Sequence, residues 1–491
     1  MHRQFFTKHI RAVILFLTLL IAYSAHPKSE FDDWIRVDTK KLSFSTNLTP
    51  QLAEELAKNL LEFMWFSQAF LPQRDGYSIP LRLIVFSQKS DFDKTVRPGK
   101  FASFTHSDLG GVKIVAAPSS SKNDDLLDNL KHELSHYQMR HSSVNYPLWY
   151  EEGMASMLSN ASLSISGNSL LAEFKTPKAS ARFPLNQSTK PIRQSWLVRH
   201  LNRKHLNNLN LRIIHNFYND SHRLAHLFHF NAAPDTRFSL HSLNLYLQDQ
   251  SDSLFLSLSI KPKELMKALR THQDEVKEPR QLSFSIPAVD LRMSVSRHSK
   301  PEVLKLLSIA SATTNPHGAI DYLLQMSEIE PTNFLSKLEL AKLYAVTNKL
   351  DKSMRYMSEA KALSSRNAKS KITEASMLIR SCAPTGNNCS DYWKTAGALI
   401  REALELDPGN IEAVYLLGVI ELYSGQPGTA LNYLKVAENH APWSPRINFH
   451  LGEALRLLGN PAGRGYLVKA RNWSNSDVWR ALAEKSINEY R

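Results

Sequence analysis

The chain has 491 residues, and its 60 lysines and arginines against 46 aspartates and glutamates give a formal net charge of +14 at pH 7. Hydrophobic residues make up 43% of the chain and charged residues 22%, which excludes a disordered or fibrous protein and allows about three folded domains. The positive charge suits an anionic partner, but it is spread along the chain and no basic run alternates with aromatic residues, so we expect no nucleic-acid binding.

Residues 1–25 form a predicted secretory signal peptide. Arg3, Lys8 and Arg11 precede an uncharged apolar run of 11 residues at 12–22, and small residues at 22–25 provide a cleavage site. The run is too short to span a bilayer comfortably, since a spanning helix needs about 20 residues. An uncleaved membrane anchor is the alternative. Cleavage would leave a net charge of +11 and no transmembrane span, and we expect an exported protein, periplasmic or secreted.

Residues 26–185 predict a mixed α/β lobe. Alternating or apolar runs indicate strands at 34–38, 42–46, 80–86 and 111–116. A helix is expected after the first two strands, because Thr49 and Pro50 form a helix start and apolar residues recur at helical spacing from Leu52 to Phe70. Residues 186–285 predict a mainly helical lobe, and the polar segment 279–301 is a predicted linker.

Residues 123–138 predict a helix that carries a metal-binding motif. Its apolar stripe is formed by Leu126, Leu130, Leu134 and Tyr137, and its cap and acidic first turn by Asn123, Asp124 and Asp125. His132 and His136 lie four residues apart, so both imidazoles can bind one ion. Glu133 can reach a water on the same ion. The pattern His-Glu-x-x-His therefore predicts two zinc ligands and a base.

A third ligand, Glu152, is predicted 16 residues after His136. Pro147 can open a second helix, and residues 139–146 are long enough to turn the chain back, which lays Glu152 against the histidines. Two histidines and one glutamate are a catalytic ligand set for zinc, because the fourth position stays open for water. Glu151 competes for this role, but it lies about 100° round the helix and is expected to face another side.

These residues resemble a known family. His132-Glu-Leu-Ser-His136 followed by Pro147-Leu-Trp-Tyr-Glu-Glu-Gly-Met-Ala155 is similar to the gluzincin-type, peptidase MA-like zinc metallopeptidases exported by bacteria, many of which carry C-terminal tetratricopeptide repeats. The resemblance is sharp over 132–155 and loose over 26–275. It implies an α+β zincin-like fold over 26–285, one zinc ion per chain on His132, His136 and Glu152, and Glu133 as catalytic base in peptide-bond hydrolysis.

Further residues of the catalytic region stay open. Stabilising the oxyanion needs another donor, and the candidates are Tyr146, Tyr150, His200, His241 and Tyr246. Ser156 departs from the family, because many gluzincins have an acidic residue four positions after the glutamate ligand, and this places metal affinity in question. His222, His226 and His229 also have helical spacing, but without a nearby carboxylate or base we interpret them as a packing stripe.

Residues 300–485 repeat with a period typical of tetratricopeptide repeats. Ala403 and Ala437, each followed five residues later by proline, are 34 residues apart, and Ala470 follows after 33. Ala360 lies 43 residues before Ala403, an excess of nine that contains both cysteines. We expect three to five stacked helical hairpins, the earliest near Ala319, that form a groove for a peptide or protein partner of the cell envelope. A passive stabilising scaffold is the alternative for this region.

The only two cysteines, Cys382 and Cys389, flank a Pro-Thr-Gly-Asn-Asn turn. In an exported chain this pair is expected to form a disulfide, and a metal site is the alternative.

Two functions of different classes follow from the sequence. The first is a zinc metallopeptidase whose repeats bind protein substrates or a partner. The second is a noncatalytic repeat scaffold of the periplasm with a structural or silent metal site. Hydrolysis of a nonprotein amide in the cell wall is a third, weaker hypothesis.

Overall fold

A computed structural model describes the chain from residue 31 to residue 490 with internal gaps. The gaps are residues 32, 72–77, 97–100, 120–124, 142–143, 175–193, 204–205, 207–208, 232–234, 250–252, 277, 286–289, 365, 383–388 and 475. The predicted signal peptide lies outside the described residues. Within them, no helix combines the length and apolar character needed to cross a membrane.

A six-stranded mixed sheet organises the first part of the chain. Its strands lie in the order β4-β5-β3-β2-β1-β9, with β2, β3 and β5 parallel and the remaining pairs antiparallel. Their bounds are β1 Ile35–Thr39, β2 Ser43–Thr46, β3 Leu81–Val85, β4 Ser103–Asp108, β5 Gly111–Ala116 and β9 Met293–Arg297. The four strands predicted from the sequence are confirmed, whereas β4 and β9 were missed.

Helices cover both faces of this sheet. Leu83 and Val85 face α2 (Pro50–Phe70) and α4 (Leu126–Met139), with which they share one apolar core. Ile84, between them in sequence, faces the other way and packs with residues of α3 (Lys89–Val96) and α11 (Lys300–Ser311). Because successive side chains of a strand point to opposite faces, this continuous apolar run predicts a strand buried on both sides.

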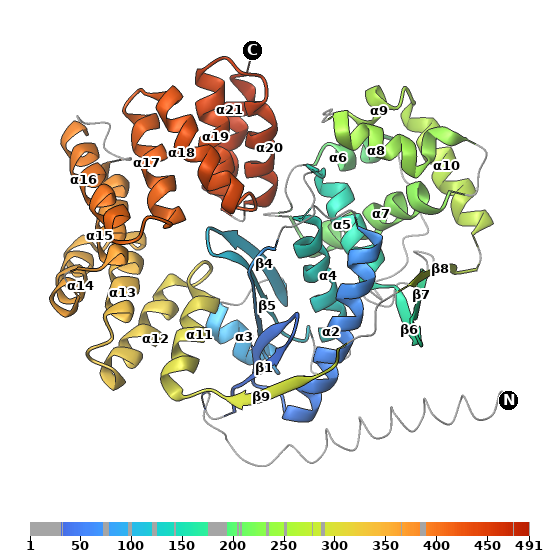
Figure 1. The fold of residues 1–491 in the computed structure, drawn as a ribbon. Coiled ribbons are helices and arrows are strands. Elements are labelled where there is room, and N and C mark those ends of the chain that lie inside the picture. The colour runs from blue at the N-terminus through green and yellow to red at the C-terminus, as the bar shows by residue number, and fades with distance from the viewer. Residues whose placement is uncertain are drawn as a thin grey trace.

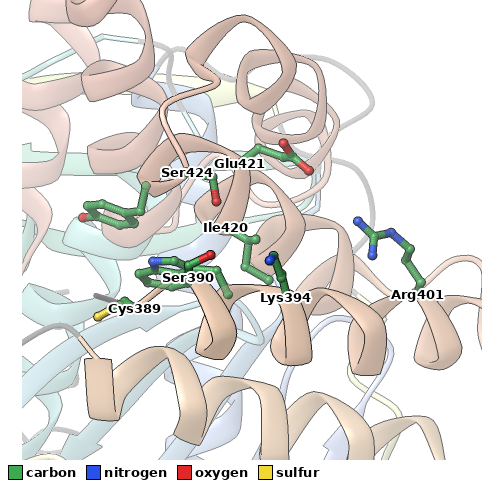
Figure 2. A pocket seen from close by; sticks show the side chains of 9 residues that line it. Cys389, Ser390, Lys394, Arg401, Ile420, Glu421 and Ser424 are labelled. Atoms are coloured by element: carbon green, nitrogen blue, oxygen red, sulfur yellow. The ribbon is translucent and has the colours of Figure 1, made fainter. Parts of the chain in front are cut away.

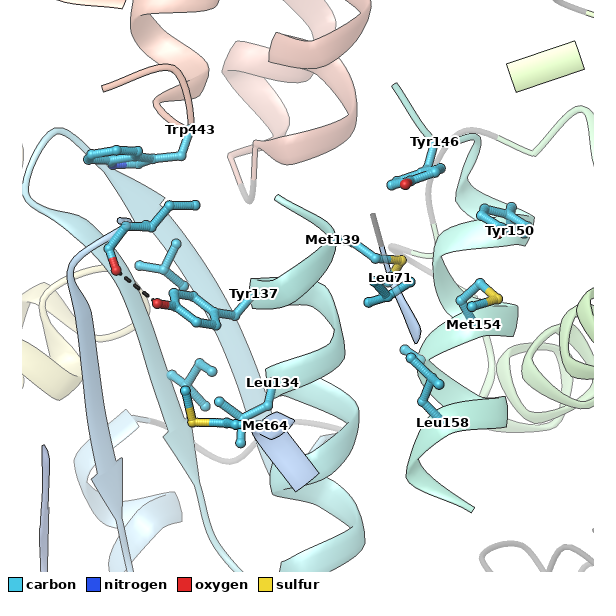
Figure 3. Packing of buried hydrophobic residues seen from close by; sticks show 14 of the residues in the cluster. Met64, Leu71, Leu134, Tyr137, Met139, Tyr146, Tyr150, Met154, Leu158 and Trp443 are labelled. Atoms are coloured by element: carbon cyan, nitrogen blue, oxygen red, sulfur yellow. Dashed lines mark hydrogen bonds between the residues drawn. The ribbon is translucent and has the colours of Figure 1, made fainter. Parts of the chain in front are cut away.

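The helix that carries the predicted metal motif lies between the sheet and α5 (Leu148–Ser159), as Figure 3 shows. Its stripe of Leu126, Leu130, Leu134 and Tyr137 is buried, as predicted, and the Tyr137 hydroxyl donates to the carbonyl of Ile79 at 2.9 Å. The expected cap differs. Asp125 occupies the N-cap position, but its carboxylate accepts from the amide of Ser119 and not from the helix. Asn123 and Asp124 lie outside the described residues.

A helical lobe and a small sheet follow α5. The helices are α6 Gln194–Leu201, α7 Leu211–Phe230, α8 Leu240–Asp249, α9 Leu254–Ser257 and α10 Pro262–Glu275, with a short 3-10 turn η2 at Thr236–Phe238. The antiparallel strands β6 Ser162–Ser166, β7 Ser169–Phe174 and β8 Arg280–Ser285 form the small sheet. The helical lobe was predicted, and the small sheet was not.

The prediction of a linker at 279–301 was wrong. Residues 280–285 form β8 and residues 293–297 form β9, which pairs with β1 and completes the edge of the main sheet. Both segments alternate apolar and polar residues, as in Leu282 and Phe284 or Met293 and Val295, which is the period of a strand. The first domain therefore extends to Arg297, and α11 begins three residues later.

The C-terminal part is an all-α repeat region, as predicted (Figure 1). Its helices are α11 Lys300–Ser311, α12 Pro316–Ile329, α13 Phe334–Val346, α14 Leu350–Leu363, α15 Ala368–Cys382, α16 Ser390–Leu406, α17 Ile411–Tyr423, α18 Pro427–His440, α19 Pro445–Leu457, α20 Gly463–Trp473 and α21 Asp477–Asn488. The first helices of successive hairpins begin 34, 34, 43 and 34 residues apart. Ala360, Ala403, Ala437 and Ala470 are each buried in the second helix of a hairpin.

The repeat region contacts the main sheet at two places that are far apart in the sequence. At their start, α11 covers one face of the sheet, and Lys113 of β5 donates to the carbonyl of Ile309 at 2.8 Å. At their end, the indole N–H of Trp443, before α19, donates to the carbonyl of Asp108 at the end of β4, also at 2.8 Å. Figure 3 shows Trp443 over this edge of the sheet. The repeat region thus contacts the first domain at both of its ends.

The cysteines lie at the insertion in the repeat period. Cys389 directly precedes α16 and is disulfide-bonded, as predicted, while the loop that joins it to Cys382 lies outside the described residues. The nine-residue excess lies within this hairpin, whose helices α15 and α16 have 15 and 17 residues against 13 and 14 in the hairpin that follows.

Candidate metal centre

Two neighbouring helices bring the three predicted ligands together. His132 and His136 occupy successive turns of α4, with ring centroids 4.9 Å apart, and Glu152 lies on α5. Nε2 of His132 is 3.1 Å and Nε2 of His136 is 3.5 Å from Oε2 of Glu152. Two imidazole nitrogens thus converge on one carboxylate oxygen, as the sequence spacing predicts.

The donor set of this group fits a zinc ion. One potential ligand atom from each of the three residues lies within 4.8 Å of the others, and no other group of three histidine, cysteine, aspartate or glutamate residues in the described part of the chain does so. Zinc binds imidazole nitrogen and carboxylate oxygen at about 2.0–2.2 Å, so three atoms this close can surround one ion. Two histidines and a glutamate leave a fourth position for water.

Electrostatics hold the group in a charged form. Burial alone would lower the pKa of His136, but attraction by Glu152 and hydrogen bonds to Glu151 and Glu152 raise it to about 10. Burial likewise opposes ionisation of Glu152, yet His136 and His132 hold the pKa of this carboxyl well below its usual range. A buried carboxylate that stays ionised between two imidazoles is available to a cation, because only the histidine protons must leave.

Glu151 does not face away from the site as expected. Its Oε1 accepts from Nδ1 of His136 at 3.2 Å, so both carboxylates of the Glu-Glu pair contact the same imidazole from different nitrogens. A helix rotation of about 100° separates them, but α4 lies close enough to be reached by both. With its proton on Nδ1, the neutral ring of His136 directs the lone pair of Nε2 toward the ligand position. Glu151 thus places a second carboxylate beside the ligands, which Ser156, four residues after Glu152, cannot do.

Glu133 lies beside the first ligand and faces β4. The hydroxyl of Ser103 donates to Oε1 at 2.8 Å, and the hydroxyl of Thr105 donates to Oε2 at 2.6 Å. These two residues were not predicted from the sequence, because the Ser-Phe-Thr-His-Ser-Asp segment has no strong strand pattern. The Gly110-Gly111 turn after it was a signal for a hairpin with β4 as its first strand.

Arg140 was also missed, and it joins several parts of the site. It caps the C-terminus of α4, and its guanidinium Nη2 is 3.9 Å from the same Oε1 of Glu151 that accepts from His136. Burial lowers the pKa of Arg140, while Glu151 and Glu133 oppose that effect. On its other side the guanidinium carbon lies 5.5 Å from the ring centre of Trp473. A buried arginine therefore connects a ligand-orienting carboxylate with the last repeat hairpin.

Gly153, directly after the glutamate ligand, permits the close packing of α5 on α7. A Cβ at this position would lie 2.3 Å from the carbonyl oxygen of Ser221, a distance that real Cβ atoms do not reach. Gly153 thus lets α7 of the helical lobe pack directly against α5, the helix that carries Glu152.

The five candidate oxyanion donors differ in partners and in burial. The hydroxyl of Tyr150 interacts with Nε2 of His229 at 3.1 Å, and buried His200 interacts with Ser221, while His241 is exposed. Tyr146 and Tyr246 are both buried. The tyrosine found against a ligand is not one of these five: it is Tyr218 of α7, whose ring centre is 5.7 Å from that of His132.

In the second histidine series His222 and His226 are buried and His229 is half-buried, in keeping with the packing interpretation. His222 and His226 lie on α7 with ring centres 6.3 Å apart, and Nδ1 of His226 shares a hydrogen bond of 2.8 Å with Nε2 of His272 on α10. Burial, the positive charge of Arg280 and neighbouring histidines lower the pKa of His226 to about 3, and similar causes lower that of His272 to about 4. These rings stay neutral and pair with each other.

The repeat region contains a separate pocket between α16 and α17, with a volume of about 670 Å³ (Figure 2). The rings of Trp393 and Tyr423 stack at 5.8 Å with an angle of 12° along one side. Lys394, Arg401 and Glu421 provide charged groups around it. The pocket can hold a polar group beside an aromatic surface.

Comparisons with known proteins bear on the repeats only. No protein-family model and no curated protein matches the sequence. Similar solved structures include TTC0263, a thermophilic TPR protein of Thermus thermophilus (14% identity, 38% of this chain and 99% of that one, TM-score 0.34), PilF of Pseudomonas aeruginosa (16%, 39% and 88%, 0.30) and the type IV pilus biogenesis factor PilW (18%, 39% and 91%, 0.31). At such scores the repeat assignment depends on the hairpin periodicity of this chain.

Proposed function

We propose that the protein is a zinc metallopeptidase with a zincin-like catalytic region and a C-terminal repeat region that binds protein substrates or partners. The convergence of His132, His136 and Glu152 on one point, with an ionised carboxylate at its centre, is the observation that supports this proposal most strongly. Export to the cell envelope, based on residues 1–25, is part of the same proposal.

A zinc ion held by these three residues would supply a Lewis acid and lower the pKa of a coordinated water. Glu133 is the proton acceptor in this scheme, because it follows the first ligand in sequence and is not itself a ligand. Ser103 and Thr105 fix its carboxylate through two hydrogen bonds. The same carboxyl group would return the proton to the leaving amine of the cleaved peptide bond.

Two further residues have roles in this scheme. In this proposal Glu151 orients His136 through Nδ1, and Tyr218, whose ring centre is 5.7 Å from that of His132, is assigned the stabilisation of negative charge on the substrate carbonyl. Tyr218→Phe should therefore retain zinc and lower kcat by about 10²–10³-fold, the effect of removing one oxyanion donor.

The central test separates metal binding from catalysis. The purified protein without its signal peptide should bind close to one zinc ion. Glu133→Gln should keep this zinc and lose peptide hydrolysis, because an amide cannot accept the proton. Glu54→Gln, at an exposed position of α2, is the matched control and should retain both properties. Full hydrolysis by Glu133→Gln would reject the assignment.

A noncatalytic repeat scaffold is the second candidate, and the pocket between α16 and α17 favours it. In that case zinc-loaded protein would cleave no peptide, and a purified partner would bind equally to wild type, Glu133→Gln and His132→Ala. Tyr423→Ala, which removes one ring of the aromatic stack, should weaken that binding. A peptide library incubated with wild-type protein distinguishes the two candidates, since the metallopeptidase predicts new N-termini that disappear in Glu133→Gln.

A further inference from the structure

The residues just before the second ligand-bearing helix, α5, are held by the distant end of the chain. Nδ2 of Asn472, near the C-terminus of α20, donates to Oδ1 of Asn145 at 3.2 Å and to the carbonyl of Tyr146 at 3.0 Å. Both acceptors lie directly before Pro147, which is the N-cap residue of α5. One side chain of the last repeat hairpin thus fixes the backbone where the Glu152 helix begins.

The next residue of α20 contacts the end of the first ligand-bearing helix, α4. Trp473 is buried, and the guanidinium of Arg140, at the end of α4, lies 5.5 Å from its ring centre. A guanidinium within about 6 Å of an indole ring is attracted to it, and more strongly when both are removed from water. Arg140 is buried as well, so this contact is shielded from water.

From Arg140 the contacts lead directly to the ligands. Its Nη2 is 3.9 Å from Oε1 of Glu151, and the same oxygen accepts from Nδ1 of His136 at 3.2 Å. Three contacts therefore connect Trp473 with a metal-ligating imidazole. Asn472 and Trp473, adjacent residues of α20, thus contact the beginning of α5 and the end of α4. The metal centre needs a fixed arrangement of these two helices, because its ligands come from both.

We infer that the last repeat hairpin is a positioning element of the metal centre, so that docking of α20 on the end of α4 and the beginning of α5 and metal binding stabilise each other. This inference rests on the metal site of the proposed function, although not on its peptidase activity. Coupling between two equilibria is reciprocal, which gives two directions to test. Loss of docking must weaken metal binding, and metal binding must strengthen docking by the same factor.

The first direction is measured as zinc affinity, by competition with a chromophoric chelator. Trp473→Leu and Asn472→Ala should each weaken zinc binding by about 10-fold, the low end of the effect of residues that orient a metal ligand, because both act indirectly, through Arg140 and Glu151 or through the start of α5. Trp473→Phe, which keeps an aromatic face for Arg140, should restore most of the affinity. Trp479→Leu is the matched control, because Trp479 packs on Phe449 and His450 within the repeats. Equal zinc affinity in all four variants would overturn the inference.

The second direction is measured on the unmodified protein, and a ligand variant serves only as its control. Zinc should slow amide hydrogen exchange in α20 of the wild type as well as in α4 and α5. In Glu152→Ala, which lacks one ligand, zinc should have no such effect on α20. Protection confined to α4 and α5 in the wild type would contradict the coupling.

The outcomes distinguish this inference from the peptidase proposal. A protein that binds zinc with the expected variant pattern but cleaves no peptide would reject the peptidase and leave the coupling standing. If the wild type cleaves peptides and the variants Trp473→Leu and Asn472→Ala bind zinc as tightly as it does, the coupling is rejected and the peptidase proposal stands. Wild-type protein that binds no zinc would reject both.

Discussion

The first domain contains two buried sets of histidines one helical turn apart, and they differ in what surrounds them. On α4, His132 and His136 face Glu152, and Glu151 contacts the second nitrogen of His136. On α7, His226 faces His272, with Arg280 nearby.

The surroundings reverse the preferred charge of the rings. Carboxylates raise the pKa of His136 to about 10, whereas burial and positive neighbours lower that of His226 to about 3. Spacing along a helix therefore places two rings together, and acidic residues from another element decide whether they can serve a cation.

The largest expected effect comes from removing the acidic partner. Glu152→Gln should reduce zinc affinity by more than about 100-fold, because even residues that only orient a ligand contribute 10–100-fold. His226→Gln in the other set should leave zinc affinity unchanged. Isothermal titration with zinc measures both. Tight zinc binding by Glu152→Gln would show that the α4 histidines do not need this carboxylate and would remove the main difference between the two sets.

The interface between α5 and α7, which joins the two sets, should be the next most sensitive. Gly153→Ala would place a methyl group against the Ser221 carbonyl and should cost about 1–3 kcal/mol of unfolding free energy, as overpacked sites do. Denaturant titration measures it. Gly409→Ala, where an added Cβ meets no atom within 4 Å, is the control. Equal stability of the two variants would mean that α7 can shift without loss.

The neutral set predicts a specific pH dependence of stability. His226 and His272 bind protons in the unfolded chain near pH 6.5, but in the folded protein only near pH 3 to 4. As the pH falls from 6.5 toward 4, the unfolded state therefore gains more protons. The unfolding free energy should then decrease by up to about 1.4 kcal/mol per pH unit for each histidine, and the contribution is complete above pH 6.5.

Urea titrations at several pH values measure this slope. His272→Gln should reduce it, whereas His241→Gln, at an exposed site, should not. An unchanged slope in His272→Gln would contradict the assignment of a neutral buried pair.

The smallest effect is expected at the hydroxyls that face Glu133. Thr105→Val removes one hydrogen bond to Oε2 while keeping the shape of the side chain. A hydrogen bond to a charged group contributes about 1.5–3 kcal/mol, so kcat should fall by about 10- to 100-fold at most, with zinc content unchanged. Steady-state kinetics with a cleaved peptide would show this, and Thr95→Val, remote from the site on α3, serves as the control.

The sequence determined the local features of this protein. The apolar stripe and histidine spacing of α4, the proline at the start of α5, four of the strands and the 34-residue period all depend on neighbours within a few turns, and each was predicted. The two strands of the main sheet that were missed, β4 and β9, lie at its two edges. β9 pairs with β1, which is distant in sequence, whereas β4 forms a hairpin with the next strand, β5, and polar residues such as Ser103 weaken its strand pattern.

Only the tertiary structure decided what the ligands touch. Glu151 and Glu152 are adjacent and chemically identical, and helix geometry alone assigned Glu151 to another side. Two packed helices instead brought both carboxylates to His136. Arg140, Trp473 and Asn472 came together because the repeats return to the domain that precedes them. Periodicity describes one helix at a time, whereas a site between helices depends on how whole elements dock, and that is fixed by the packing of the complete chain.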